Sequence, residues 1–151
     1  MARNGGDPLP AVNGAEAALH GLGAARAGLD QRPAGRGHWF ADWSGRLAGS
    51  DVYIAVMGKS VSARKVRLVL DDWILEDVAV QHVGDVLTAV FSAAPGPDGG
   101  AEIRRGRALL VLPVLVLRVR AGRARYSATK RLPEEGAAPP SPWERALTAD
   151  E

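Results

Sequence analysis

The amino-acid sequence predicts a mainly β protein: a small antiparallel barrel or sandwich with a short N-terminal helical segment and a tethered C-terminal helix. Apolar and polar residues alternate with the two-residue period of a strand from residue 50 onwards. An uninterrupted apolar run, 108–117, is about half of the roughly 20 residues that span a bilayer, so it is interpreted as a buried strand. A chain of 151 residues can enclose one such core.

Three regions are predicted along the chain. Residues 1–37 are rich in Ala, Gly and Pro, and we expect them to be flexible, with 1–14 disordered. One frail helix is predicted over 15–29, because each of its three glycines weakens it by roughly 1 kcal/mol. Residues 38–132 are expected to form the single mostly-β domain. Residues 133–151 are expected to form a Pro-rich linker and a short helix.

The first segment of the domain, 38–47, holds two of the four tryptophans. Trp39, Trp43 and Leu47 would share one face of a helix, which favours one or two helical turns here. The Ser-Gly pair that follows Trp43 could equally turn a short strand, so that alternative stays open. Aromatic residues at this density indicate a lid over the core rather than a platform for a ligand.

Alternating side chains then favour a series of strands. Gly84 and Asp85 are predicted to form a two-residue hairpin loop before the last of them, and three β-branched residues favour a strand after this loop. The alternative is a short helix over 86–93 with Asp85 as its N-cap. The predicted strands cover residues 51–57, 63–70, 74–83 and 86–91.

A long strand is predicted over 107–120. Proline cannot donate to a central ladder, so Pro113 is the place where this strand would break. Ala121 and Gly122 are predicted to turn the chain into a further strand over 123–129. The second half of the domain is therefore expected to end in a hairpin.

Charge is segregated along the chain. Nine Arg or Lys residues and no acid lie between residues 103 and 133, whereas 71–85 holds five acids and no Lys or Arg. The predicted hairpin sets Arg118 opposite Arg125, and like charges in that position are destabilising. Such a pattern indicates a charged partner or pairing between the protein's own surfaces. A net charge of +2 and the single Tyr126 among these arginines are modest for a nucleic-acid binder.

No motif for catalysis or cofactor binding is found. The chain has no Cys, which excludes disulfides and thiolate chemistry. Gly58-Lys59-Ser60 is similar to the end of a phosphate-binding loop, but Tyr53 stands where that loop requires a glycine, so a turn is predicted. The three His residues lack the spacing of metal ligands. We therefore expect neither cofactor nor metal, although the acids of 71–85 leave an enzyme as an open alternative.

The C-terminal helix has its own start signal. Ser141, Pro142 and Glu144 stand at the N-cap, N1 and N3 positions of a capping box. Trp143 and Leu147 give this helix a small apolar face. A helix this short is unstable alone in water, so it must dock either on its own domain or on a partner.

These features favour a non-enzymatic accessory or adaptor protein that binds the acidic surface of another protein or of a second copy. Such proteins accompany larger ones in bacterial operons, for instance in defence or secretion loci, and the composition is typical of a high-GC bacterium. A nucleic-acid-binding β-barrel is the first alternative and an enzyme the second. No secretory signal or membrane span is visible, which favours the cytoplasm. The predicted partner-binding residues are Arg118, Arg120, Arg123, Arg125, Trp143 and Leu147.

Overall fold

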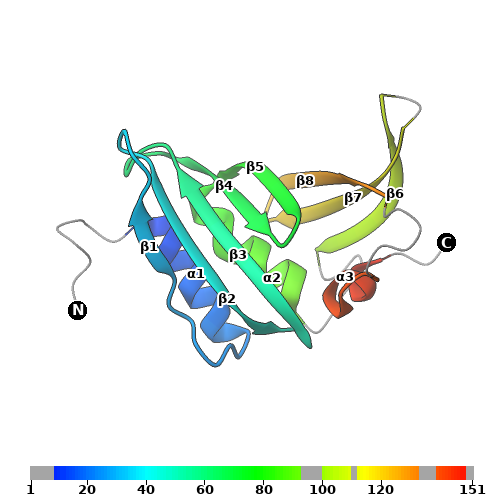
Figure 1. The fold of residues 1–151 in the computed structure, drawn as a ribbon, viewed down its shortest axis with the longest axis horizontal. Coiled ribbons are helices and arrows are strands. Elements are labelled where there is room, and N and C mark those ends of the chain that lie inside the picture. Colours follow the sequence, from blue (N-terminus) through cyan, green and yellow to red (C-terminus); the bar gives the residue numbers. More distant parts are fainter. Residues whose placement is uncertain (1–8, 93–99, 110–111, 133–138, 149–151) are drawn as a thin grey trace.

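Figure 1 shows a mainly β fold with two antiparallel sheets, a helix near the N-terminus and a short helix near the C-terminus. The computed structural model describes residues 9–92, 100–109, 112–132 and 139–148. The predicted fold class is confirmed, and the two sheets are not closed into a barrel. Most of the predicted linker and of the predicted N-terminal disorder lies outside the described residues.

The first sheet is a five-stranded meander, and the second has three strands in sequence order. Helices α1 (Pro10–Gly21) and α2 (Val83–Phe91) lie against one face of the first sheet, and the 3-10 turn η1 (Val80–His82) leads into α2 (Figure 1). Helix α3 (Pro142–Leu147) contacts β6 and α2. The strands are β1 (Asp30–Pro33), β2 (Trp39–Leu47), β3 (Ser50–Gly58), β4 (Lys65–Leu70), β5 (Trp73–Ala79), β6 (Ala101–Ala108), β7 (Leu112–Ala121) and β8 (Ala124–Arg131).

Helix α1 begins at Pro10, five residues before the predicted helix. Proline suits the first turn of a helix, because the N–H that it lacks would have no partner there. The chain leaves the helix after Gly21, so the predicted continuation to Leu29 is wrong. The side chains that α1 buries follow the helical period, and they are Ala11, Val12, Ala15, Ala18 and Leu19.

The segment around Gly84 is helical, so the predicted hairpin loop and the strand at 86–91 are wrong. The alternative helix is right in kind, although α2 begins at Val83 and Asp85 lies in its first turn rather than at its cap. The strand predicted over 74–83 ends at Ala79. Burial with a helical period outweighs the β propensity of the valines. The buried residues of α2 are Val83, Val86, Leu87, Val90 and Phe91.

The tryptophan segment forms strand β2 rather than the predicted helical turns. Trp39, Ala41 and Trp43 are buried in alternation, and a four-residue spacing of the two rings fits either a strand or a helix. The indole N–H of Trp39 donates to the Ser60 carbonyl at 2.9 Å, and that of Trp43 donates to the Arg26 carbonyl at 2.6 Å. Both rings therefore fill the core with their polar atoms satisfied.

Strands β3 and β4 confirm the predicted alternation. They pair antiparallel, with Val56 opposite Leu68, and Lys65 and Arg67 point outward and are exposed. Two adjacent strands with one apolar face each provide the flat surface against which the helices pack. The predicted inward side chains are at most 3% exposed: Val52, Ile54, Val56, Val66, Leu68 and Leu70.

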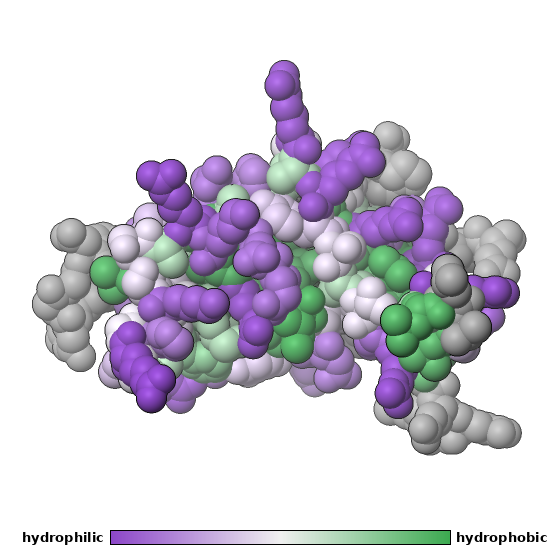
Figure 2. Space-filling model, turned by 90° about the horizontal axis from the view of Figure 1, so that it is seen from above, coloured by the Kyte–Doolittle hydropathy of each residue, from purple (hydrophilic) through white to green (hydrophobic). Residues whose placement is uncertain are grey.

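The prediction of one long strand over 107–120 is wrong, because this range is divided between the end of β6 and β7. Strands β6 and β7 pair antiparallel with Ala108 opposite Leu112, so the apolar run 108–117 spans the turn of a hairpin. This hairpin projects from the body of the protein (Figure 1). Seen from above, hydrophobic residues lie among hydrophilic ones at its end (Figure 2).

The predicted hairpin between β7 and β8 is confirmed, but its register differs by two residues. Gly122 has a φ of +61°, which suits the first position of a two-residue loop, so the loop is Gly122-Arg123 rather than Ala121-Gly122. Arg120, and not Arg118, therefore lies opposite Arg125. The predicted faces are unchanged, because a shift by an even number keeps each residue on its side of the sheet.

The contact between α1 and α2 depends on two glycines. A Cβ on Gly84 would lie 2.8 Å from the carbonyl oxygen of Gly14, which is a backbone atom and cannot rotate away. The two helices are therefore packed closely enough that no larger residue fits at Gly84 without moving one of them.

Replacing Gly84 by Ala should destabilise the protein. Overpacking costs about 1–3 kcal/mol, and the better helix propensity of Ala returns roughly 1 kcal/mol, so we expect a net loss of up to about 2 kcal/mol. Gly21→Ala is the control, since nothing lies within 4 Å of its added Cβ. Urea denaturation followed by circular dichroism measures both variants. Equal stability of the two would contradict the close helix contact.

Candidate arginine-lined binding site

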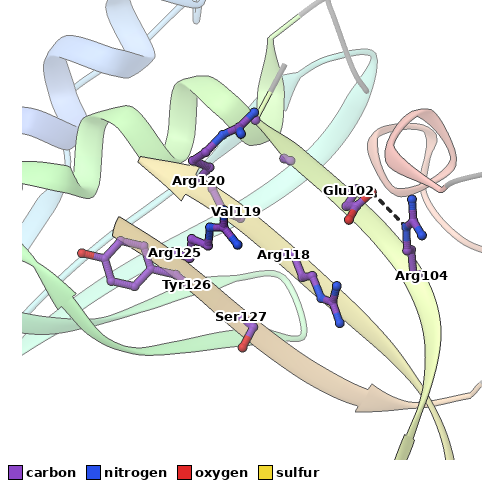
Figure 3. Close-up of a pocket in the computed structure, with 10 residues that line it drawn as sticks. Glu102, Arg104, Arg118, Val119, Arg120, Arg125, Tyr126 and Ser127 are labelled. Carbon is purple, nitrogen blue, oxygen red and sulfur yellow. Dashed lines mark hydrogen bonds and ion pairs between the residues drawn. The ribbon is translucent and has the colours of Figure 1, made fainter. Parts of the chain in front are cut away.

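A pocket of about 530 Å³ lies on the outer face of the second sheet. All three strands of the sheet contribute to it, and Figure 3 shows the arginine side chains that line it. Three of the four predicted hairpin arginines are among them. The charged residues of the pocket are Arg104 and Glu102 from β6, Arg118 and Arg120 from β7, and Arg125 from β8.

The alternation of strand β7 brings its arginines to one face. Leu117 and Val119 point into the core and are at most 2% exposed. Arg118 and Arg120 therefore point to the other face. The register of the hairpin adds Arg125, which lies directly opposite Arg120. The strand pattern thus places these arginines on one face of the sheet.

The pocket has a strong excess of positive charge. Four arginines meet a single acid, and that acid, Glu102, forms an ion pair with Arg104 at 3.0 Å. Among the described residues, Arg118 and Arg125 form no ion pair. Arg120 and Arg125 lie directly opposite each other on neighbouring strands. A guanidinium group presents planar donors that match a carboxylate or phosphate, so this face suits an anion.

Arg123 is the predicted arginine that does not line the pocket, because it occupies the second position of the β7–β8 loop. Arg104 and Glu102 line the pocket and were not predicted as site residues. Residues 107–120 were predicted to form one strand, with no strand directly before it, so β6 was missed. The signal was present in the alternation of buried Ala101 and Ile103 with the two charged residues.

Tyr126 offers no stacking surface among these arginines. Its ring points away from them (Figure 3). Its hydroxyl accepts a hydrogen bond from the amide of Ala79 at 3.1 Å and lies 2.8 Å from Nδ1 of His82. The side chain therefore attaches β8 to the end of β5 and the turn that follows it.

Trp143 and Leu147, the remaining predicted partner-binding residues, pack against the protein's own core and are 1% and 4% exposed. The indole N–H of Trp143 donates to the Asp71 carboxylate at 2.8 Å, and its ring meets Phe91 edge to face at 5.2 Å between centroids. The amide of Trp143 donates to the Ser50 hydroxyl at 3.0 Å. Helix α3 thus docks on its own domain, one of the two outcomes that the sequence allowed, and neither side chain lines the pocket.

Glu144 joins α3 to both sheets. Its carboxylate accepts hydrogen bonds from the Trp73 indole of β5 at 3.1 Å and from Lys130 of β8 at 2.7 Å. The N-cap residue Ser141 donates through its amide at 3.0 Å and its hydroxyl at 2.8 Å, so the predicted capping box is confirmed. Burial opposes ionisation, but the donors outweigh it and hold the pKa of Glu144 below its ordinary 4.5.

The acids of 71–85 lie apart from the pocket, which none of them lines. Asp71 accepts hydrogen bonds from Trp143 and from the amide of Tyr53, and Glu76 pairs with Arg67 on the neighbouring strand. In the ranges that the structure describes, no three His, Asp or Glu residues are grouped to hold a metal ion. The helices in those ranges are also too short or too polar to cross a bilayer.

Comparisons with known proteins identify no relative. No protein-family model matches the chain, and no curated protein or solved structure matches it either. The basis for a function is therefore the pocket itself, with its charge and its position on a regular sheet.

Trp143→Ala should lower the free energy of unfolding by about 3–5 kcal/mol, because it leaves a large cavity and removes a donor from Asp71. Arg123→Ala, in an exposed loop, should change stability by less than about 0.5 kcal/mol and is the control. Urea denaturation measures both. A Trp143→Ala variant as stable as the wild type would show that the indole is not part of the core and is free to anchor a partner.

Glu144→Gln should destabilise the protein by about 1–2 kcal/mol at pH 7, because a neutral amide cannot satisfy the same donors. The pKa of Glu144 is lowered on folding, so the contribution of the carboxylate is complete above its ordinary pKa of 4.5 and is lost as the pH falls through the lowered value. The stability difference between wild type and variant should therefore shrink in acid. Unfolding titrations at pH 7 and about pH 3 test this sign, and a constant difference would contradict it.

Proposed function

We propose that this protein is a non-enzymatic accessory or adaptor protein that binds an acidic segment of another protein in the arginine-lined pocket. The observation that supports this most is the convergence of Arg104, Arg118, Arg120 and Arg125 from three strands on one pocket with a single acid. The backbone positions of these arginines are fixed by the ladders of a regular sheet, so the spacing of the charges is set before a ligand binds.

The geometry of β7 favours an extended acidic peptide. Arg118 and Arg120 are two residues apart on one face, which is about 6.6 Å along a strand. An extended peptide with Asp or Glu at every second position repeats its carboxylates at the same distance. Arg125 on β8 provides a third guanidinium across the hairpin, opposite Arg120. Forked contacts to successive carboxylates would supply both affinity and register.

A nucleic acid is the rival ligand, since phosphate also suits guanidinium groups. Proteins that bind single strands add aromatic rings on which bases stack. The ring of Tyr126 points away from the arginines, and its hydroxyl is engaged by β5 and His82. Tyr126 lines the pocket, but its ring is turned from the arginines, and this arrangement favours a peptide over stacked bases.

The test compares ligands and charge-reversal variants by fluorescence anisotropy. The probes are a labelled peptide with Glu at every second position, a peptide of residues 71–85 that tests self-association, and a single-stranded oligonucleotide. The double variant Arg118→Glu, Arg125→Glu should weaken binding of the alternating peptide at least about tenfold, because two charge-assisted contacts are lost. Lys59→Glu with Arg64→Glu, which makes the same change of net charge outside the pocket, should leave binding unchanged.

Two results would overturn the proposal. The first is equal affinity of the wild type and the Arg118, Arg125 variant for the peptide. The second is preferential binding of the oligonucleotide with an affinity that falls steeply as salt rises, since that dependence reports the release of counterions from neutralised phosphates.

A further inference from the structure

The hairpin of β6 and β7 extends beyond the rest of its sheet. Strand β8 ends at Arg131, which lies opposite Val114, whereas β6 and β7 continue to the pair Ala108 and Leu112. The end of the hairpin is therefore two strands wide and projects from the body of the protein (Figure 1).

Hydrophobic side chains at this end are exposed. Leu109 is 89% exposed and Leu112 is 39% exposed, and both lie within a sequence that is apolar from Ala108 to Leu117. Leu109 also has a φ of +52°, a region that glycine or asparagine occupies at lower cost. Neither burial nor backbone geometry accounts for a leucine here, and such departures are typical of functional positions.

Arginines lie directly behind these leucines. Arg105 and Arg107 are exposed on β6, and no acid occurs between residues 103 and 133. Figure 2 shows the hydrophobic end of the hairpin beside hydrophilic residues. An apolar end followed by cations is complementary to an anionic lipid surface, where acyl chains lie beneath negatively charged headgroups.

We propose that the end of the β6–β7 hairpin inserts into the interface of a membrane that contains anionic phospholipid. Leu109 and Leu112 enter the boundary between headgroups and acyl chains, and Arg105 and Arg107 contact the headgroups. This interaction is additional to the proposed peptide binding, because neither leucine and neither of these arginines lines the pocket.

A lipid surface fits this hairpin better than a protein groove does. A stable protein interface buries about 800 Å² on each partner and requires complementary shape. The narrow end of this hairpin offers the exposed Leu109 and Leu112, with Arg105 and Arg107 behind them. Insertion into lipid needs no matching shape, and its strength comes from the buried apolar area together with the attraction of the cations to anionic headgroups.

The absence of Cys from the chain allows a specific test. Leu109→Cys in the full chain is labelled with an environment-sensitive fluorophore and mixed with vesicles of phosphatidylcholine and phosphatidylglycerol. The emission should shift to the blue, and the shift should be smaller with pure phosphatidylcholine. Val61→Cys is the control, because Val61 is 73% exposed but lies outside the hairpin, so its label should not shift.

Charge and pocket variants separate this inference from the proposed function. Adding Arg105→Glu and Arg107→Glu to the labelled protein should abolish the preference for anionic vesicles, whereas Arg118→Glu with Arg125→Glu should retain the blue shift. The proposal would be overturned if the emission of the label at position 109 did not shift with either kind of vesicle. It would also be overturned if the emission shifted equally at positions 109 and 61. Loss of peptide binding on Leu109→Ser with no effect of vesicles would instead assign the hairpin end to a protein interface.

Discussion

The carboxylate of Glu144 joins the two sheets, and among the described residues no ladder of backbone hydrogen bonds runs between them. It accepts from Trp73 of the first sheet and from Lys130 of the second, and Ser141 holds it at the start of α3. A carboxylate that is only 13% exposed is costly to bury unless donors meet it. Its four donors meet that requirement.

The two faces of the second sheet have different roles. The inner face, with Leu117, Val119 and Ala128, contributes apolar burial and joins the common core. The outer face carries Arg118, Arg120 and Arg125, which are exposed.

Prediction from the sequence was most accurate where the apolar residues fit only one period, either that of a strand or that of a helix. Strands β3 and β4 bury all of the side chains predicted to point inward, and the basic cluster identified three of the pocket arginines. Prediction from the sequence failed where the strand period and the helix period both fit the same residues. The tryptophans of β2 and the valines of α2 are such cases, because burial in the assembled core decides between the two periods. Because residues 108–117 are all apolar, no polar residue indicated the turn after Ala108. Strand β6 and the place of Arg104 in the pocket were therefore not predicted. The burial of Trp143 depends on Phe91 and Asp71, which are distant in sequence.

Strand β7 also limits how the chain can change in length. Val119 is 2% exposed between two outward arginines, so the insertion or deletion of one residue between Val114 and Leu117 would turn Arg118 and Arg120 into the core and Val119 into solvent. Only changes by even numbers, or changes confined to the hairpin end, would preserve both faces. Related chains that retain the pocket should therefore vary in length at the turn after Leu109 and hardly at all between Val114 and Ala121.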